Sequence, residues 1–342
     1  MNCAIRANDE NDLLAIIATV LQNNGDANKI NFHKERLFMI RAAIVGYGNI
    51  GRAVLDAIET APDIECAGVV LRDITKRNEK GVPAEITVAE DIGDLGKVDV
   101  ALLCIPTLTV PDANEKNGAI NLLARGIHTV DSFDKHGDAM LALRTQLDAA
   151  GKAHNSVAVI GAGWDPGIDS MIRGIFEFSA PRGVTYTNFG PGMSMGHTVA
   201  AKGIAGVRNA LSVTIPLGTG LHRRMVYVEL EAGFDFTTVA AAIKADDYFV
   251  NDDTRVMQVE DVTALQDVGH GVSMVRKGAS GRTDNQQFTF DMRINNPALT
   301  AQIMVAAARA ACKQTPGCYT MLDIPVGHFL HGDADALTRR LV

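Results

Sequence analysis

Residues Ile40 to Gly51 read IRAAIVGYGNIG and are the strongest indication of the fold. Their first half, Ile40–Val45, predicts a buried strand, and the GxGxxG that follows opens a predicted helix at 50–59. In this setting Gly46 permits a tight turn, Gly48 lets a pyrophosphate approach the backbone, and Gly51 lets helix and strand pack closely. We therefore interpret Gly46, Tyr47, Gly48, Asn49, Ile50 and Gly51 as a dinucleotide-binding loop. The alternative is that the glycines serve only a tight strand-to-helix turn.

Beyond this loop, β-branched runs alternate with helical stretches, which is typical of a parallel sheet covered by helices. Predicted strands lie at 40–45, 66–71, 98–105, 127–131 and 157–160, and predicted helices at 50–59, about 111–125 and 137–150. After residue 169 a helix to residue 178 precedes alternating stretches that predict an antiparallel sheet, at 184–189, 210–215, 225–232, 272–276 and 287–294. The fold class is therefore α/β: a doubly wound Rossmann domain plus an α+β domain with a mixed or antiparallel sheet.

We expect four parts along the chain. Residues 1–38 precede the first strong strand and are interpreted as an N-terminal extension from an upstream start; their acidic residues do not suit a signal peptide. Residues 39–168 form the dinucleotide-binding domain and 169–296 the second domain. Residues 297–342 begin with a helix at 297–312, capped by Asn296 with Pro297 in its first turn, and are expected to pack back on the first domain.

Composition excludes several classes of protein. The 342 residues are 47% hydrophobic and 21% charged, which suits a folded chain with a sizeable core. Acidic side chains outnumber basic ones by 40 to 32, so a net charge of -8 repels nucleic acid. The five cysteines form no CxxC pair, so no metal site is expected and a reducing cytoplasm fits. No apolar run approaches the ~20 residues that cross a bilayer, so we expect a soluble protein without a membrane partner.

The end of the second predicted strand bears on the choice of nucleotide. Asp73 lies 22 positions after Gly51, where an acidic residue binds a ribose 2′-hydroxyl, and this favours NAD. Arg72, Lys76 and Arg77 surround it and could hold the 2′-phosphate of NADP instead. The residues alone leave the choice between NAD and NADP open, and a solvated charge cluster is the plainer alternative.

Four segments are denser in Asp, Trp, His, Gly and Pro than a structural loop requires, and they read VDSFDKH (130–136), GAGWDPG (161–167), FGPGMSMGHT (189–198) and DVGHG (267–271). Together with GYGNIG, these segments resemble the meso-diaminopimelate dehydrogenase family from about Met39 to the C-terminus. The resemblance implies NADP-dependent, reversible oxidative deamination of meso-2,6-diaminopimelate at its D-centre in bacterial lysine biosynthesis. The products would be ammonia and L-2-amino-6-oxopimelate, which cyclises to tetrahydrodipicolinate. It also implies a homodimer or higher homo-oligomer, with residues 169–296 binding substrate and dimerising.

The resemblance also assigns roles to residues. Asp134 and Asp165 match an acidic pair beside the reacting amino group and are our catalytic candidates. The substrate-binding candidates are Trp164, Phe189, Thr214, Arg224, His270 and Asn296, and the further cofactor-binding candidates are Arg72, Asp73, Cys104, Ile105, Pro106 and Thr107. Phe189 stands where some members have Trp, and Met195 where others have Gln, which indicates a second subgroup of the family with a wider substrate range.

The chemistry of these side chains agrees with the roles. Hydride transfer needs no protein nucleophile; it needs the reacting C–H held over the nicotinamide and the ammonium deprotonated. The carboxylates of Asp134 and Asp165 can accept hydrogen bonds from the amine and relay a proton. Arg224 offers a bidentate fork to a substrate carboxylate, with Thr214 and His270 as further donors.

Plainer roles compete with these assignments. Asp165 could cap the helix that follows, Asp131 and Asp134 could be strand-end turn residues, Trp164 could be core, and His270 could mark a loop. Because Arg224 follows His222 and Arg223, another member of that run could point inward. His197 is a weaker candidate for the site.

The sequence leaves two other functions open. One is another two-domain Rossmann oxidoreductase, such as an aspartate or homoserine-type dehydrogenase or dihydrodipicolinate reductase. The other is a nucleotide-sensing protein that has lost its chemistry.

Overall fold

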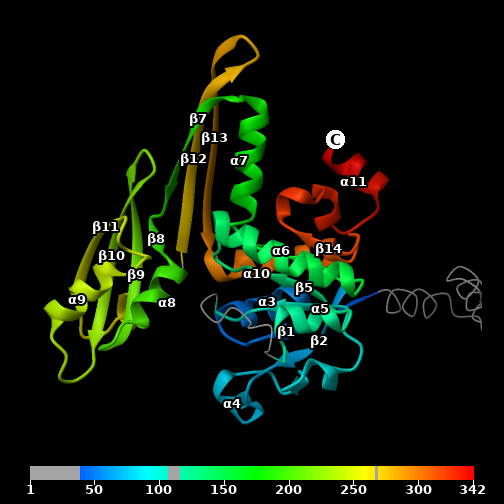
Figure 1. Ribbon diagram of the computed structural model, residues 1–342, viewed down its shortest axis with the longest axis horizontal. Helices are drawn as coiled ribbons and strands as arrows, with labels where there is room; N and C mark the ends of the chain where they lie inside the picture. Colours follow the sequence, from blue (N-terminus) through cyan, green and yellow to red (C-terminus); the bar gives the residue numbers. More distant parts are fainter. Residues whose placement is uncertain (1–38, 107–115, 266–268) are drawn as a thin grey trace, which may run out of the picture.

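The computed structural model describes residues 39–106, 116–265 and 269–342 (Figure 1). The predictions for residues 1–38, for Thr107 and for the first part of the helix expected at 111–125 lie outside these residues. Among the helices that are described, none combines the length and the apolar character that crossing a membrane requires.

The first half of the chain supplies six of the seven strands of a parallel sheet, and the seventh, β14, comes from near the C-terminus. Their order is β14 (Gly317–Tyr319), β6 (Val157–Val159), β5 (His128–Asp131), β4 (Val100–Leu103), β1 (Ile40–Val45), β2 (Ile64–Val70) and β3 (Val88–Ala89). Apart from β14, this is the 3-2-1-4-5-6 order of the Rossmann fold, and every strand pair is parallel. The predicted α/β fold class is confirmed, and the five predicted strands are all present.

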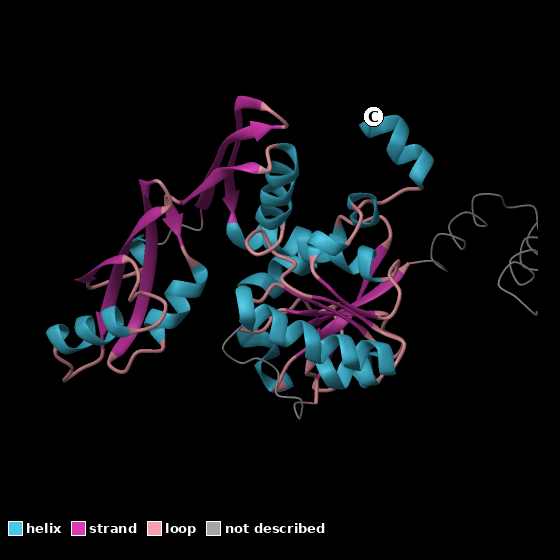
Figure 2. Cartoon of the chain, turned by 45° about the horizontal axis from the view of Figure 1, so that its top comes forward, coloured by secondary structure: helices cyan, strands magenta, loops and turns pink. Residues whose placement is uncertain are grey.

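Helices cover both faces of this sheet (Figure 2). On β1, Ala42 and Ile44 join one core cluster with the apolar faces of α3 (Asn49–Glu59) and α10 (Asn296–Ala311). Ala43 and Val45 join a second cluster with residues of α5 (Ala119–Ala124) and α6 (Gly137–Ala153). The continuous apolar run at 42–45 is thus explained, because alternate side chains point to opposite faces and both faces are buried.

The second half has the predicted antiparallel and mixed β-structure, but its strands are divided between two sheets rather than joined in one. One has the order β11 (Asp253–Gln258), β10 (Leu221–Leu230), β9 (Val207–Gly218) and β8 (Gly192–Met193). The other has the order β13 (Thr283–Asn295), β12 (Gly269–Ser280) and β7 (Arg182–Phe189) and stands beside α7 (Ile168–Ser179) (Figure 1). The first sheet is mixed because β10 and β11 pair in parallel, with the connecting chain passing through α9 (Phe236–Ala245).

The last part of the chain returns to the parallel sheet. Helix α10 packs against α3, and Arg309 on α10 forms an ion pair with Asp63 just before β2. The side chain that caps α10 is Asn295, whose Oδ1 accepts a hydrogen bond from the N–H of Ala298. The prediction of Asn296 as the cap was therefore wrong, because Asn296 already lies in the helix and its amide turns toward Trp164. After α10, β14 pairs with β6, and α11 (Ala334–Leu341) ends the chain.

Candidate functional site

The GxGxxG loop joins β1 to α3 in the conformation that its glycines predict. Gly46 has a φ of 91°, and a Cβ there would lie 2.7 Å from the carbonyl oxygen of Cys104. A Cβ on Gly51 would lie 2.3 Å from the carbonyl oxygen of Gly46, so both outer glycines are required by close packing. A Cβ added to Gly48, the N-cap of α3, would lie in open space, with no atom within 4 Å. The loop thus leaves room for a phosphate against the backbone at the N-terminus of α3.

The other cofactor-binding candidates differ in whether a bound nucleotide could contact them. Tyr47 is buried and its ring belongs to the core, so only its backbone could reach a nucleotide. Ile50, Ile105 and Pro106 line the cavity described below, and Asn49 is exposed at the start of α3.

In the loop after β2, some charged side chains are engaged in local hydrogen bonds and others are exposed. Asp73 Oδ1 accepts hydrogen bonds from the N–H and the hydroxyl of Thr75, which hold the pKa of Asp73 below its ordinary value. Arg77 donates to two backbone carbonyl oxygens, whereas Arg72 and Lys76 are exposed. The two exposed cations are therefore accessible to a 2′-phosphate, while Asp73 is engaged within its own turn.

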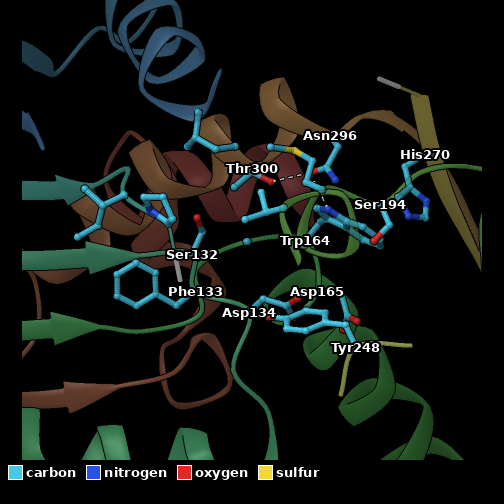
Figure 3. A pocket seen from close by; sticks show the side chains of 17 residues that line it. Ser132, Phe133, Asp134, Trp164, Asp165, Ser194, Tyr248, His270, Asn296 and Thr300 are labelled. Atoms are coloured by element: carbon cyan, nitrogen blue, oxygen red, sulfur yellow. Dashed lines mark hydrogen bonds between the residues drawn. The ribbon is translucent and has the colours of Figure 1, made fainter. Parts of the chain in front are cut away.

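A cavity of about 220 Å³ opens where β5 and β6 end and faces α8 (Met195–Lys202) (Figure 3). This size suits part of a small molecule rather than a macromolecule. Its walls are Ile50, Ile105, Pro106, Ser132, Phe133, Asp134, Gly163, Trp164, Asp165, Ser194, Met195, Gly196, Val199, Tyr248, His270, Asn296 and Thr300. Both catalytic candidates and three of the substrate candidates, Trp164, His270 and Asn296, are brought together here.

The two aspartates come from the loops after neighbouring strands. Asp134 follows β5 and its Oδ1 lies 2.8 Å from His136 Nε2, a contact that raises the pKa of His136. Asp165 follows β6 and accepts a hydrogen bond of 2.8 Å from Arg173 on α7. The N-cap of α7 is Gly167, so the alternative that Asp165 caps this helix is wrong. On the far wall, a Cβ on Gly196 would lie 2.8 Å from Asp134 Oδ2, so glycine leaves room for this carboxylate.

Trp164 lies beside this pair at the centre of an aromatic and polar cluster. Its Nε1 donates to Asn296 Oδ1 at 3.0 Å, and Thr300 donates to the same oxygen at 3.3 Å. Its ring centroid is 4.9 Å from that of His270 and 5.9 Å from that of Phe189. Trp164 is thus both a core residue and part of the cavity wall, because these contacts fix the plane of its indole.

His270 is a buried strand residue, so the alternative that it marks a loop is wrong. Its Nδ1 lies 2.7 Å from the N–H of Gly271 and 3.1 Å from the carbonyl oxygen of the same residue. The shorter contact makes Nδ1 an acceptor and leaves the proton on Nε2. Burial lowers the pKa of His270 to about 4, so the ring is neutral near pH 7 and Nε2–H can donate to a substrate oxygen.

Arg224 and Thr214 face each other across β10 and β9, outside the cavity wall. The guanidinium donates to Thr214 Oγ1 through Nη1 and to Asp252 Oδ2 through Nε, the latter at 2.6 Å. Only 11% of the Arg224 side chain is exposed, against 33% for Arg223, which pairs with Asp253. Within the run 222–224, Arg224 is therefore the arginine that points inward.

Phe189 and His222 complete this side of the site. The N–H of Phe189 donates to His222 Nε2 at 2.8 Å, and their rings lie 5.4 Å apart. Phe189 also contacts Trp164, so it links the Arg224 side to the cavity.

Sequence reasoning missed several residues of the cavity. Tyr248, from the connection between α9 and β11, lines the cavity together with the two aspartates (Figure 3), and no motif marked it. Ser132 and Ser194 lie inside segments that the motifs did mark, and Ser194 Oγ lies 2.8 Å from His197 Nδ1. Asp131 is buried and accepts from the N–H groups of Phe133 and Gly161, which confirms the alternative of a strand-end structural residue. In the described part of the chain, no group of three or more His, Cys, Asp or Glu residues could hold a metal ion.

Comparison with known proteins agrees with this geometry. The family described as "Diaminopimelic acid dehydrogenase C-terminal domain" matches residues 163–296. A meso-diaminopimelate D-dehydrogenase of Bacteroides fragilis is 58% identical over 306 residues, which cover 89% of this chain and 99% of that protein. One from Lysinibacillus sphaericus is 33% identical, with 89% of this chain and 99% of that protein covered.

Solved structures have the same fold. The diaminopimelate (DAP) dehydrogenase of C. glutamicum in complex with DAP superposes with a TM-score of 0.78 at 27% identity, covering 89% of this chain and all of that one. An engineered D-amino acid dehydrogenase bound to NADP+ has a TM-score of 0.77 at 28% identity, with the same coverage. With 58% identity to a curated relative over most of both chains, this chain belongs to the meso-diaminopimelate D-dehydrogenase family.

Proposed function

We propose that this chain catalyses the NADP-dependent, reversible oxidative deamination of meso-2,6-diaminopimelate at its D-centre. The products are ammonia and L-2-amino-6-oxopimelate, which cyclises to tetrahydrodipicolinate, and the role is in bacterial lysine biosynthesis. The observation that carries the proposal is the convergence of Asp134, Asp165 and Trp164 on one cavity beside the GxGxxG loop. Membership of the dehydrogenase family supports it.

The residues present fit NADP. Open space at Gly48 and the N-terminus of α3 would take the pyrophosphate, and the exposed Arg72 and Lys76 would take the 2′-phosphate. Ile50, Ile105 and Pro106 would contact the end of the cofactor that enters the cavity. When bound, NADP accepts a hydride from the amino-bearing carbon of the substrate.

Around the reacting carbon, the work of the protein is to position groups and to move protons. Asp134 and Asp165 accept hydrogen bonds from the substrate ammonium, and one carboxylate takes the proton that must leave before the C–N bond becomes an imine. Water then adds to the imine carbon and ammonia leaves. The half-exposed His136, 2.8 Å from Asp134, provides a route for the proton to solvent.

The other end of the substrate is held by donors. Arg224 binds the distal carboxylate, and Thr214 and His270 Nε2–H add hydrogen bonds. Trp164 and Asn296 form the wall that fixes which face of the reacting carbon is presented to the hydride acceptor, and Phe189 packs against the Trp164 ring.

We further propose that the domain boundaries lie near residues 168 and 296. We also propose that the chain forms a homodimer or higher homo-oligomer in the cytoplasm. Apolar side chains left open at the end of α7 and on β7 support an interface there: Phe178 is 75% exposed, Val184 56% and Tyr186 38%. Analytical ultracentrifugation tests this, since a monomer at micromolar concentration contradicts it.

The activity is tested with a panel of diaminopimelate stereoisomers. The purified chain is assayed with NAD and with NADP by the absorbance of the reduced nicotinamide. We expect NADPH to form with the meso isomer and not with the LL isomer. Tight NADPH binding without turnover of any isomer would support a nucleotide sensor instead.

A further inference from the structure

Asp252 is a carboxylate that the reaction does not require, yet it pairs with Arg224. It lies between α9 and β11, and its Oδ2 accepts the Nε–H of Arg224 at 2.6 Å. The pair is shielded from solvent, with 20% of the Asp252 side chain and 11% of the Arg224 side chain exposed. At this burial a charge-assisted hydrogen bond constrains the guanidinium more than a surface pair would.

Strand pairing fixes a second edge of the same guanidinium. Arg224 on β10 lies opposite Thr214 on β9, and Thr214 Oγ1 accepts from Nη1. Of the five N–H donors of an arginine, one on Nε and one on Nη1 are thereby used. The donors that remain are one on Nη1 and both on Nη2, and these are the N–H groups that Arg224 can offer to a substrate carboxylate.

His197 is a second titratable side chain beside Asp252. Its Nε2 lies 4.0 Å from Asp252 Oδ2, and its Nδ1 lies 2.8 Å from the hydroxyl of Ser194, which lines the cavity. Burial first, and then the positive charge of Arg224, lower the pKa of His197 to about 4. His197 is therefore neutral near pH 7, and Arg224 supplies the positive charge that faces Asp252.

We propose that Asp252 is a positioning residue that makes the site selective for substrates with a distal carboxylate. It holds the Nε side of Arg224 so that the Nη edge is presented in one orientation to that carboxylate. This inference rests on the proposed function, because it concerns the same substrate. Without Asp252 the arginine must be ordered when substrate binds, so affinity for the distal carboxylate falls.

Asp253 provides a matched control. It is the next residue and also pairs with an arginine, accepting from Arg223 Nε at 2.7 Å. Its side chain is twice as exposed, at 40%, and its partner points away from the site. Asp253→Asn therefore removes the same charge from the same segment without freeing Arg224.

The test compares Asp252→Asn with Asp253→Asn on two ligands. One ligand is meso-diaminopimelate, used as the substrate. The other is D-lysine, used as a competitive inhibitor or substrate, which has the same carbon skeleton and amino groups without the distal carboxylate. For Asp252→Asn we expect the KM for meso-diaminopimelate to rise about tenfold, the size of one lost charge-assisted hydrogen bond, with kcat within about twofold. The inhibition constant of D-lysine should not change, and Asp253→Asn should change neither constant.

Asp252→Glu is the rescue variant. It keeps the carboxylate, so its KM should fall between those of the wild type and Asp252→Asn, and it keeps the test open if the Asn variant does not fold. A lower KM in Asp252→Asn would show that Asp252 competes with the substrate, and equal losses for both ligands would show a general structural role; either result overturns the proposal. If wild type and Asp253→Asn both fail to reduce NADP with meso-diaminopimelate, the proposed function itself is wrong.

Discussion

Asp169 is a buried carboxylate, and we predict that its ionisation makes the stability of the protein depend on pH. It lies in the first turn of α7, and its side chain has 0% exposure. Its N–H donates to the carbonyl oxygen of Trp164, but neither carboxylate oxygen has a hydrogen-bond partner among the described residues. Burial first, and then the negative charge of Asp165, raise the pKa of Asp169 from 3.8 to about 7, with Arg173 opposing them.

Because the pKa of Asp169 is raised in the folded protein, stability is lost as the pH rises. The folded protein holds the proton more tightly than the unfolded chain, so the stabilisation is complete below pH 3.8 and is lost as the pH rises through about 7. At about 1.4 kcal/mol per pH unit, the full difference corresponds to about 4 kcal/mol. Between pH 5 and pH 8.5, Asp169 should account for about 3 kcal/mol of lost stability.

Asp169→Asn tests this value because the amide cannot ionise. Any cost of burying the amide is the same at both pH values, so it cancels from the comparison. We expect the free energy of unfolding, measured by urea denaturation, to fall by about 3 kcal/mol less in Asp169→Asn than in the wild type between pH 5 and pH 8.5. Asp138→Asn is the control, since Asp138 holds the same position in α6 but is exposed. Equal pH dependence in wild type and Asp169→Asn would show that Asp169 does not have a raised pKa in the folded protein.

Three further predictions concern the site. Asp165→Asn should lower kcat by about a hundredfold or more while the Kd for NADPH stays unchanged. Equal losses of turnover and of NADPH affinity would indicate that Asp165 only anchors Arg173. Arg224→Lys keeps the charge but loses the fork, so steady-state kinetics should show a KM for meso-diaminopimelate about tenfold higher, and an unchanged KM would remove Arg224 from the site. Asp73→Asn keeps an oxygen for Thr75 but removes the charge, so NADP should bind more tightly relative to NAD by titration; an unchanged ratio would mean that this side chain does not face the nucleotide.

The parallel sheet could be predicted from the sequence because its signals are local. Each of its five predicted strands is a short apolar run followed by a turn, and the GxGxxG loop identifies the first crossover. The predicted ends were less accurate: the strand expected at 98–105 is Val100–Leu103. The strand β14, three residues long, was not predicted, since it depends on pairing with β6 from a distant part of the chain.

The candidate site could be predicted only where sheet geometry brings loops together. Asp134 and Asp165 follow adjacent parallel strands, so their meeting at one edge follows from topology. Tyr248 and Asp252 could not be predicted, because they depend on β11 pairing in parallel with β10 after α9. Local alternation in the sequence does not distinguish that arrangement from an antiparallel sheet.

In the proposed reaction, hydride leaves the D-centre of meso-diaminopimelate beside Asp134 and Asp165. The most direct measurement uses two substrates, one with deuterium on the D-carbon and one with deuterium on the L-carbon, followed by mass spectrometry of the reduced cofactor. We predict that deuterium appears in NADPH only from the D-labelled substrate and slows its single-turnover reaction. Transfer from the L-labelled substrate, or reduced cofactor without deuterium from either one, would show that the hydride does not come from the D-centre.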